Sequence, residues 1–303
     1  MLETLKRGVS QFLRSTTKVS QGLNKLPENF DAEVYLRLNP DIRAAGVNPE
    51  WHYINHGQKE NRPYVLTSIG EKTCPVCGSD EFTQIKALWD ELISDWKLSA
   101  AEVTYIDRQQ GLSCVSCGNN LRSMVLAKAI LSHLGSRDTL TQAAERFRFR
   151  NLRVLEINQA GNLSPHLAKF PRHTLLSYPE GDMMNLEYDA GTWDLIVHSE
   201  TLEHVPDPMK GLRETLRILR PGGACIFTIP IIIGGMTRSR EGLKDSFHGD
   251  PKNATADYRV VTEFGADAWT FVMSAGFESC RIHSMDYPAG LALEAIKQAN
   301  PIG

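Results

Sequence analysis

The stretch Trp193–Pro208, WDLIVHSETLEHVPDP, decides how the C-terminal half of this chain is expected to fold. Its first part, Trp193–His198, is a short apolar run with the length of a strand, and a helix is expected from about Pro208. An earlier run, Arg153–Ile157 (RVLEI), leads in the same way to a helix start at Ser164-Pro165. Short apolar strands that alternate with helices predict an α/β fold, a mostly parallel sheet with helices on both faces.

The same alternation continues to the end of the chain. The further predicted elements are a strand near Thr174–Ser177, a helix at about Pro208–Leu219, a Pro221-Gly222-Gly223 turn into a strand Ala224–Ile231, a helix at about Gly265–Ala275, a strand near Ser279–Ser284, and a last strand or helix over Leu291–Gln298.

The composition is that of an ordinary globular protein. The 303 residues include 33 Lys and Arg against 36 Asp and Glu, a net charge of −3, and 42% of the residues are hydrophobic. The hydrophobic fraction excludes wholesale disorder. The chain also lacks the surplus of basic residues that is typical of a nucleic-acid binder, so we expect no DNA partner and do not expect RNA. The longest apolar run, Ala224–Gly235, is too short for a membrane span of roughly 20 residues, and basic residues interrupt the first stretch, which favours a cytoplasmic protein.

Four of the six cysteines form two CxxC pairs. These are Cys74 and Cys77 (CPVC), and Cys114 and Cys117 (CVSC), and each pair is followed by glycine. The pattern resembles the paired knuckles of a zinc ribbon, in which four thiolates bind a structural zinc ion tetrahedrally. Two disulfides or a redox dithiol are the alternatives.

The interval between the two cysteine pairs is longer than in a compact ribbon. Apolar residues with helical spacing between Ala87 and Trp96 predict a helix inserted into the ribbon. Cys225 and Cys280 lie in predicted strands, where we expect them to serve as packing residues.

The chain before the sheet divides into four predicted segments. Residues 1–28 are expected to form a basic amphipathic helix, of which residues 1–26 are a candidate for weak contact with a membrane surface. Residues 29–66 are expected to form a small helical module. Its run YLRLNPDIRAAGVNPEWHYINHGQKENR (Tyr35–Arg62) resembles a module often attached to bacterial glycan-synthesis enzymes. Residues 67–120 are the ribbon with its helical insert, residues 121–150 are a helical connector, and residues 151–303 are the candidate catalytic domain.

The ordered motifs of residues 151–303 resemble a class I S-adenosylmethionine-dependent methyltransferase of the type 11 kind. VLEI matches the family's first strand, WDLIVHSETLEHVPDP its "LEHV-x-DP" segment, and LRETLRILRPGGACIFTIP its "LKPGG" segment. HGDP followed by VVTEFGADAW resembles a subgroup of the family. The resemblance implies a Rossmann-like, seven-stranded sheet and methyl transfer to an oxygen or nitrogen of a small-molecule or glycan-linked acceptor.

One family motif is degenerate here. The family usually has "E/D-x-G-x-G-x-G" after the first strand, and this chain has Asn158, Ala160 and Asn162 at the three glycine positions, with Gly161 between two of them. Glycines there let the backbone approach the cofactor closely. The chain therefore either binds the cofactor with a reshaped loop or is a catalytically inactive binding or scaffold protein with a methyltransferase fold.

The resemblance also implies roles for individual residues. Glu156 would orient the loop or the cofactor's amino group, Glu180 would bind the ribose hydroxyls beside Tyr178 at the adenine, and Asp182 would accept from the adenine amino group. The complete implied cofactor site is Glu156, Asn158, Gly161, Tyr178, Glu180, Asp182, Met183, Ser199 and Glu200.

A methyltransferase needs a group that removes a proton from the acceptor. His248 is the first candidate for this general base and His204 the second, because a histidine near its ordinary pKa accepts a proton at neutral pH. Arg238 and Arg240 are candidates for binding an acidic acceptor. A nicotinamide enzyme is disfavoured because G-x-G-x-x-G is absent, and a zinc-ribbon RNA modifier stays an alternative because of the basic stretch Arg146–Arg153.

Overall fold

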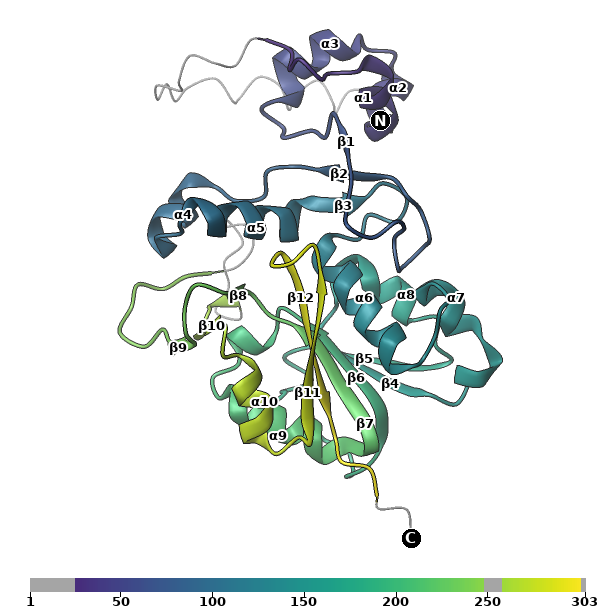
Figure 1. Ribbon diagram of the computed structural model, residues 1–303, viewed down its shortest axis with the longest axis vertical. Helices are drawn as coiled ribbons and strands as arrows, with labels where there is room; N and C mark the ends of the chain where they lie inside the picture. The colour runs from purple at the N-terminus through teal and green to yellow at the C-terminus, as the bar shows by residue number, and fades with distance from the viewer. Residues whose placement is uncertain (1–24, 248–257, 301–303) are drawn as a thin grey trace. The chain divides into compact units, whose positions relative to one another are not determined.

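The computed structural model describes residues 25–247 and 258–300 (Figure 1). The chain divides into two compact units, the first ending at Tyr64 and the second beginning at Val65. Within the described ranges, no helix combines the length and the apolar character that crossing a membrane requires.

The first unit is a small helical module. It contains α1 (Ala32–Leu38), α2 (Pro40–Ala45) and α3 (Pro49–His52), and α3 continues into a π-helical turn over Tyr53–Gly57. Proline at the first position of α2 and of α3 fixes both helix starts. The Tyr35 hydroxyl and His52 Nδ1 share a buried hydrogen bond of 2.8 Å, so this histidine serves the core of the module.

The second unit is built on a six-stranded sheet in the order β11-β12-β7-β6-β4-β5. The strands are β4 (Arg153–Ile157), β5 (Arg172–Leu176), β6 (Trp193–Ser199), β7 (Leu219–Thr228), β11 (Ser279–Met285) and β12 (Gly290–Ile296). Strands β5, β4, β6 and β7 are parallel, and β12 runs antiparallel to both of its neighbours. The expected α/β sheet is confirmed, and the ambiguous C-terminal segment is a strand.

The sheet has six strands in the described residues, where the resemblance implied seven. Only residues 177–192 separate β5 from β6, and each parallel crossover takes a dozen residues or more. This interval has no room for an additional strand with two crossovers. The expected Pro221-Gly222-Gly223 turn lies inside β7 as an irregularity, since Trp193 pairs with Leu219 whereas Leu195 already pairs with Ala224.

Alternate residues of the strands face two separate cores. Val154, Leu195 and Ile226 belong to the core that contains α6 (Leu121–His133) and α7 (Leu140–Glu145). Leu155, Ile196 and Phe227 belong to the other core, with α9 (Pro208–Ile218) and α10 (Trp269–Ala275). The period of two along each strand therefore produces the helix-covered faces seen in Figure 1.

The cysteine-bearing ribbon shares the first of these cores. Its antiparallel sheet consists of β1 (Leu66–Thr67), β2 (Phe82–Gln84) and β3 (Leu112–Cys114). Val76, Phe82 and Leu112 are buried in the same cluster as α6 and Val154 of the large sheet. The ribbon is thus continuous with the large sheet's core.

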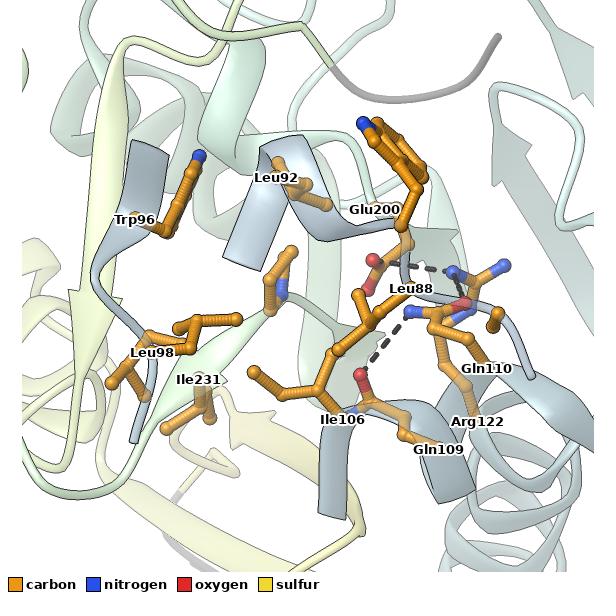
Figure 2. Close-up of a pocket in the computed structure, with 14 residues that line it drawn as sticks. Leu88, Leu92, Trp96, Leu98, Ile106, Gln109, Gln110, Arg122, Glu200 and Ile231 are labelled. Atoms are coloured by element: carbon orange, nitrogen blue, oxygen red, sulfur yellow. Dashed lines mark hydrogen bonds and ion pairs between the residues drawn. The ribbon is translucent and has the colours of Figure 1, made fainter. Parts of the chain in front are cut away.

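Two helices, α4 (Asp90–Trp96) and α5 (Ala100–Gly111), are inserted between β2 and β3 and border a cavity (Figure 2). Helix α5 begins with a complete capping box, in which Ser99 and Glu102 each bind the other's backbone N–H.

The remaining elements of the second unit are short. The 3₁₀ turns are Phe147–Phe149, Gly161–Leu163 and Leu202–His204, the short helix α8 covers Ser164–Leu167, and a small sheet consists of β8 (Ile231–Ile232), β10 (Thr262–Gly265) and β9 (Arg238–Ser239).

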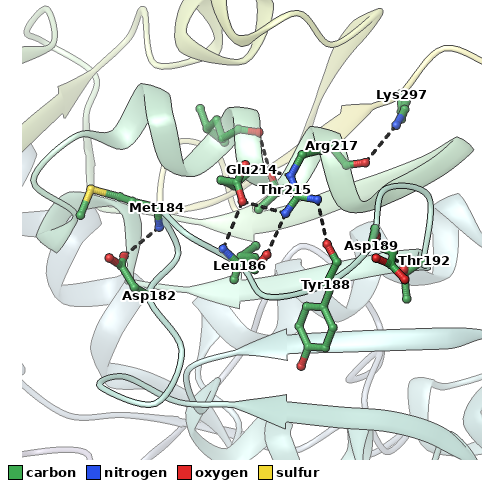
Figure 3. Close-up of polar contacts among 11 residues, drawn as sticks. Asp182, Met184, Leu186, Tyr188, Asp189, Thr192, Glu214, Thr215, Arg217 and Lys297 are labelled. Atoms are coloured by element: carbon green, nitrogen blue, oxygen red, sulfur yellow. Dashed lines mark hydrogen bonds and ion pairs between the residues drawn. The ribbon is translucent and has the colours of Figure 1, made fainter.

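Arg217 of α9 fixes the chain that leads into β6 (Figure 3). Its guanidinium donates hydrogen bonds of 2.7 Å to the carbonyl oxygens of Leu186 and Tyr188 and also pairs with Glu214, which accepts from the Leu186 amide. This network satisfies backbone groups of a segment that has no regular secondary structure.

Replacing Arg217 by Met should therefore lower the free energy of unfolding by about 1–2 kcal/mol, because two backbone carbonyls lose their donors. Urea unfolding followed by circular dichroism measures this change. The matched control is Arg213→Met at an exposed position of the same helix, which should change the free energy by less than about 0.5 kcal/mol. Equal effects of the two substitutions would contradict the assigned role.

Candidate functional site

The four predicted metal ligands converge on one point. The Sγ atoms of Cys74 and Cys117 are 3.8 Å apart, those of Cys77 and Cys114 are 3.6 Å apart, and all four lie within 4.8 Å of one another. A tetrahedral zinc ion with bonds of about 2.3 Å needs sulfurs about 3.8 Å apart. The cysteines are free thiols rather than disulfides, so the donor set fits a structural zinc ion.

The two knuckles have matching backbone geometry. The Gly78 amide donates to the Cys74 carbonyl at 2.8 Å, and the Gly118 amide donates to the Cys114 carbonyl at 2.9 Å. Both glycines have positive φ, 90° and 66°, which explains the glycine after each CxxC pair.

The second knuckle is bonded to the loop that follows β4. Asn162 Nδ2 donates to the Gly118 carbonyl at 2.7 Å, and Asn119 Nδ2 donates to the Asn162 carbonyl at 3.1 Å. Asn119 also contacts Cys117 Sγ at 3.5 Å. Asn162 stands at one of the family's glycine positions, and its side chain links the loop to the cysteine centre.

Glu156, in β4, is hydrogen-bonded to the same loop. Its buried carboxylate accepts hydrogen bonds from the Ala160 amide at 2.8 Å, the Ser164 hydroxyl at 3.0 Å and His173 Nε2 at 2.8 Å. These contacts hold the turn between β4 and α8 in place.

The loop keeps a glycine-like path despite its substitutions. Asn158 has φ of 57° and Gly161 has φ of 54°, in the left-handed region that asparagine tolerates better than most residues. Asn158 Oδ1 accepts from the Tyr178 amide at 2.9 Å, which ties the ends of β4 and β5 together. A Cβ atom added at Gly161 would meet no atom within 4 Å, so the edge of the sheet is open there.

The other implied cofactor residues lie at the ends of β5 and β6. Tyr178 and Glu180 are exposed, whereas Met183 is buried in the core. Asp182 Oδ1 accepts from the Met184 amide at 2.8 Å (Figure 3).

The last two of the implied cofactor residues are tied to β7. The hydroxyls of Ser199 and Thr228 share a hydrogen bond of 2.8 Å, and the Glu200 amide donates to the Thr228 carbonyl at 2.9 Å. Both residues therefore sit at the carboxyl edge of the parallel strands, where open α/β sheets bind ligands.

The candidate bases differ in their surroundings. His248 lies outside the described residues. His204 Nδ1 donates to the Arg259 carbonyl at 3.0 Å, and its Nε2 lies 3.5 Å from Glu203 Oε1. Burial raises the pKa of Glu203 to about 7, and the neighbouring His204 opposes this shift.

Arg238 and Arg240, the predicted anion-binding residues, both pair with Glu263. The two guanidinium groups are therefore bound to a carboxylate of the small sheet itself.

Sequence reasoning missed the residues that line a cavity of about 340 Å³ beside Glu200 (Figure 2). Arg122 forms an ion pair of 3.2 Å with Glu200 and donates to Gln110 Oε1 at 2.9 Å. One signal was available, because Arg122 lies in the first turn of α6, where the helix dipole disfavours a cation.

Comparison with known proteins identifies the domain. The family model described as "Methyltransferase domain" matches residues 115–227, and the chain therefore contains a methyltransferase domain. The match includes α6, β4, β5, β6, α9 and nearly all of β7.

Curated relatives align over parts of their length. Norajmaline N-methyltransferase of Rauvolfia serpentina is 39% identical over 69 residues, which are 23% of this chain and 23% of that protein. Ubiquinone biosynthesis O-methyltransferase of Coxiella burnetii is 26% identical over 160 residues, which are 47% of this chain and 59% of that protein. This chain thus spans less than two thirds of either relative.

Among solved structures, a SAM-dependent methyltransferase of Thermotoga maritima, described as a possible histamine N-methyltransferase, has 19% sequence identity and a TM-score of 0.33. The similarity covers 59% of this chain and 99% of that one.

The cysteine centre predicts about one zinc ion per chain by metal analysis. Cys114→Ser should release the metal and lower the melting temperature by about 10 °C, because metal binding contributes directly to folding of the shared core. Cys280→Ser, outside the centre, should keep the metal. A metal-free protein of unchanged melting temperature would contradict the assignment.

Buried Glu203 predicts a pH-dependent contribution to stability. Because its pKa rises from 4.5 to about 7 on folding, the contribution is complete below pH 4.5 and is lost as the pH rises through 7. The free energy of unfolding of the native protein minus that of Glu203→Gln should therefore fall by up to about 3 kcal/mol over this range in urea titrations.

Ser132→Ala, at an exposed position without a titratable group, should give a difference that does not vary with pH. A flat profile for Glu203→Gln as well would show that Glu203 ionises normally.

Proposed function

We propose that this chain transfers a methyl group from S-adenosylmethionine to an oxygen or nitrogen of a small-molecule acceptor. The observation that carries the proposal is the methyltransferase-domain match over residues 115–227, because these residues supply α6 and the parallel strands whose carboxyl ends form the open edge. The names of two relatives, norajmaline N-methyltransferase and ubiquinone biosynthesis O-methyltransferase, support a small organic acceptor.

The loop after β4 fits a nucleotide cofactor. Its left-handed residues, Asn158 and Gly161, keep the turn that close backbone approach requires, and the space beside Gly161 is open. We assign Glu180 to the ribose hydroxyls and Tyr178 to the adenine, since both side chains are exposed immediately after β5. Asp182 would accept from the adenine amino group.

The protein's part in the reaction is positioning and proton removal. S-adenosylmethionine, when bound, supplies a sulfonium-activated methyl group, which leaves as the carbon–sulfur bond breaks. The residues at the ends of β6 and β7 would orient the acceptor atom toward it, and His248 would take the proton that the acceptor loses, with His204 as the second candidate. The glycan-linked acceptor suggested by residues 29–66 stays a prediction that rests on resemblance.

The proposal predicts that S-adenosylmethionine binds to the zinc-loaded full chain in isothermal titration calorimetry and that NADH does not. Glu180→Gln should weaken this binding by about 10- to 100-fold, the cost of losing hydrogen bonds to a charged group. Glu187→Gln, at an exposed position of the same segment, should leave the affinity unchanged.

Absence of S-adenosylmethionine binding by a folded, zinc-loaded chain would remove the enzymatic function and favour a scaffold role. Binding that is unaffected by Glu180→Gln would move the ribose contact to another residue.

A further inference from the structure

The cavity beside Glu200 lies between the ribbon's insert and the large sheet (Figure 2). Its walls come from α4 and α5 on one side and from Pro230, Ile231 and Ile232, directly after β7, on the other. Glu200, the first residue after β6, places the cavity at the carboxyl edge of β6, the strand that pairs with β4 on one side and β7 on the other.

Most of the lining is apolar. Leu88, Leu92, Trp96, Leu98 and Ile106 come from the insert, and the segment after β7 adds only proline and isoleucine. A sugar placed against these side chains would leave most of its hydroxyls without hydrogen bonds, which is costly. The lining therefore favours a flat apolar ligand over a carbohydrate.

The polar groups gather at one end of the cavity and are bonded to one another. Arg122 pairs with Glu200 and donates to Gln110, and Gln110 Nε2 in turn donates to Gln109 Oε1 at 3.2 Å. Gln109 is held by the Ala289 carbonyl at 2.9 Å. Arg122 Nε is buried and makes no hydrogen bond within the described structure. This end offers both donors and a carboxylate to a single polar substituent.

The wall formed by α4 is bonded to the segment that follows β9. Trp96 Nε1 donates to the Ser246 hydroxyl at 2.8 Å, the Arg240 guanidinium lies 5.0 Å from the Trp96 ring centre, and Asp95 pairs with Lys244 at 2.7 Å. A volume of about 340 Å³ is at the small end of the range for ligand pockets and suits one or two fused rings.

We propose that this cavity binds the methyl acceptor, and that the acceptor is a small hydroxylated aromatic compound whose hydroxyl group lies against Arg122 and Glu200. The acceptor role rests on the proposed function, whereas the ligand class follows from the lining itself. The helices inserted between the cysteine pairs would thus select the substrate, and the ring would lie among Leu88, Leu92 and Trp96.

Calorimetry on the zinc-loaded full chain tests this with three probes: 2-naphthol, naphthalene and methyl glucoside. We expect 2-naphthol to bind at one site, at least about tenfold more tightly than naphthalene because of its hydroxyl group, and methyl glucoside not to bind. Leu92→Gln, a change of similar size, should weaken 2-naphthol binding at least tenfold. Ile93→Gln, on the same helix but outside the lining, should change it less than twofold.

Equal binding of 2-naphthol by the two variants, tight binding of the glucoside, or no preference for the hydroxyl group would overturn the proposal. S-adenosylmethionine is titrated into the same samples, and its affinity should be the same in both variants. If it binds while the naphthol result fails, the cavity assignment is wrong and the methyltransferase function stands. If it does not bind while 2-naphthol binds as expected, the acceptor role falls with the proposed function.

Discussion

Helix α6 is the element against which both the ribbon and the large sheet pack. Nine of its 13 residues are buried, which is more than the single apolar stripe of a surface helix. It packs on β7, β11 and β12, on α5 of the insert and on α7. The cysteine centre, the insert and the large sheet therefore share one core, and Arg122 enters the cavity from the start of this helix.

The same arrangement explains the degenerate glycine motif. In this chain the loop after β4 lies against the second cysteine knuckle, where Asn162 and Asn119 each donate to a backbone carbonyl of the other segment. A glycine at residue 162 would have no side chain to make the first of these bonds. The loss of glycine thus adds a contact with the knuckle, while Asn158 and Gly161 retain the left-handed backbone that the turn needs.

Sequence patterns placed the parallel strands and the cysteine ligands well, because both depend on local spacing. The short apolar run Trp193–His198 and the two CxxC pairs each carry their geometry within a few residues. The cavity was not predictable in this way, since Gln109, Arg122 and Glu200 are distant in sequence and meet only through packing around α6. The sixth and last strand of the sheet was ambiguous because its residues are buried on both faces, which removes the alternation of period two.

The insert is attached at both ends to paired strands, namely β2, which follows the first cysteine pair, and β3, which ends at Cys114. Its two helices are therefore an insertion whose two ends are held by paired strands, like the antigen-binding loops on the framework of an antibody domain. Under the proposed function, exchanging residues 85–111 for another helical segment would change acceptor choice and leave the contacts of the loop after β4 in place. Divergence within such proteins should then concentrate between the knuckles, and the same boundaries offer a graft site for engineering.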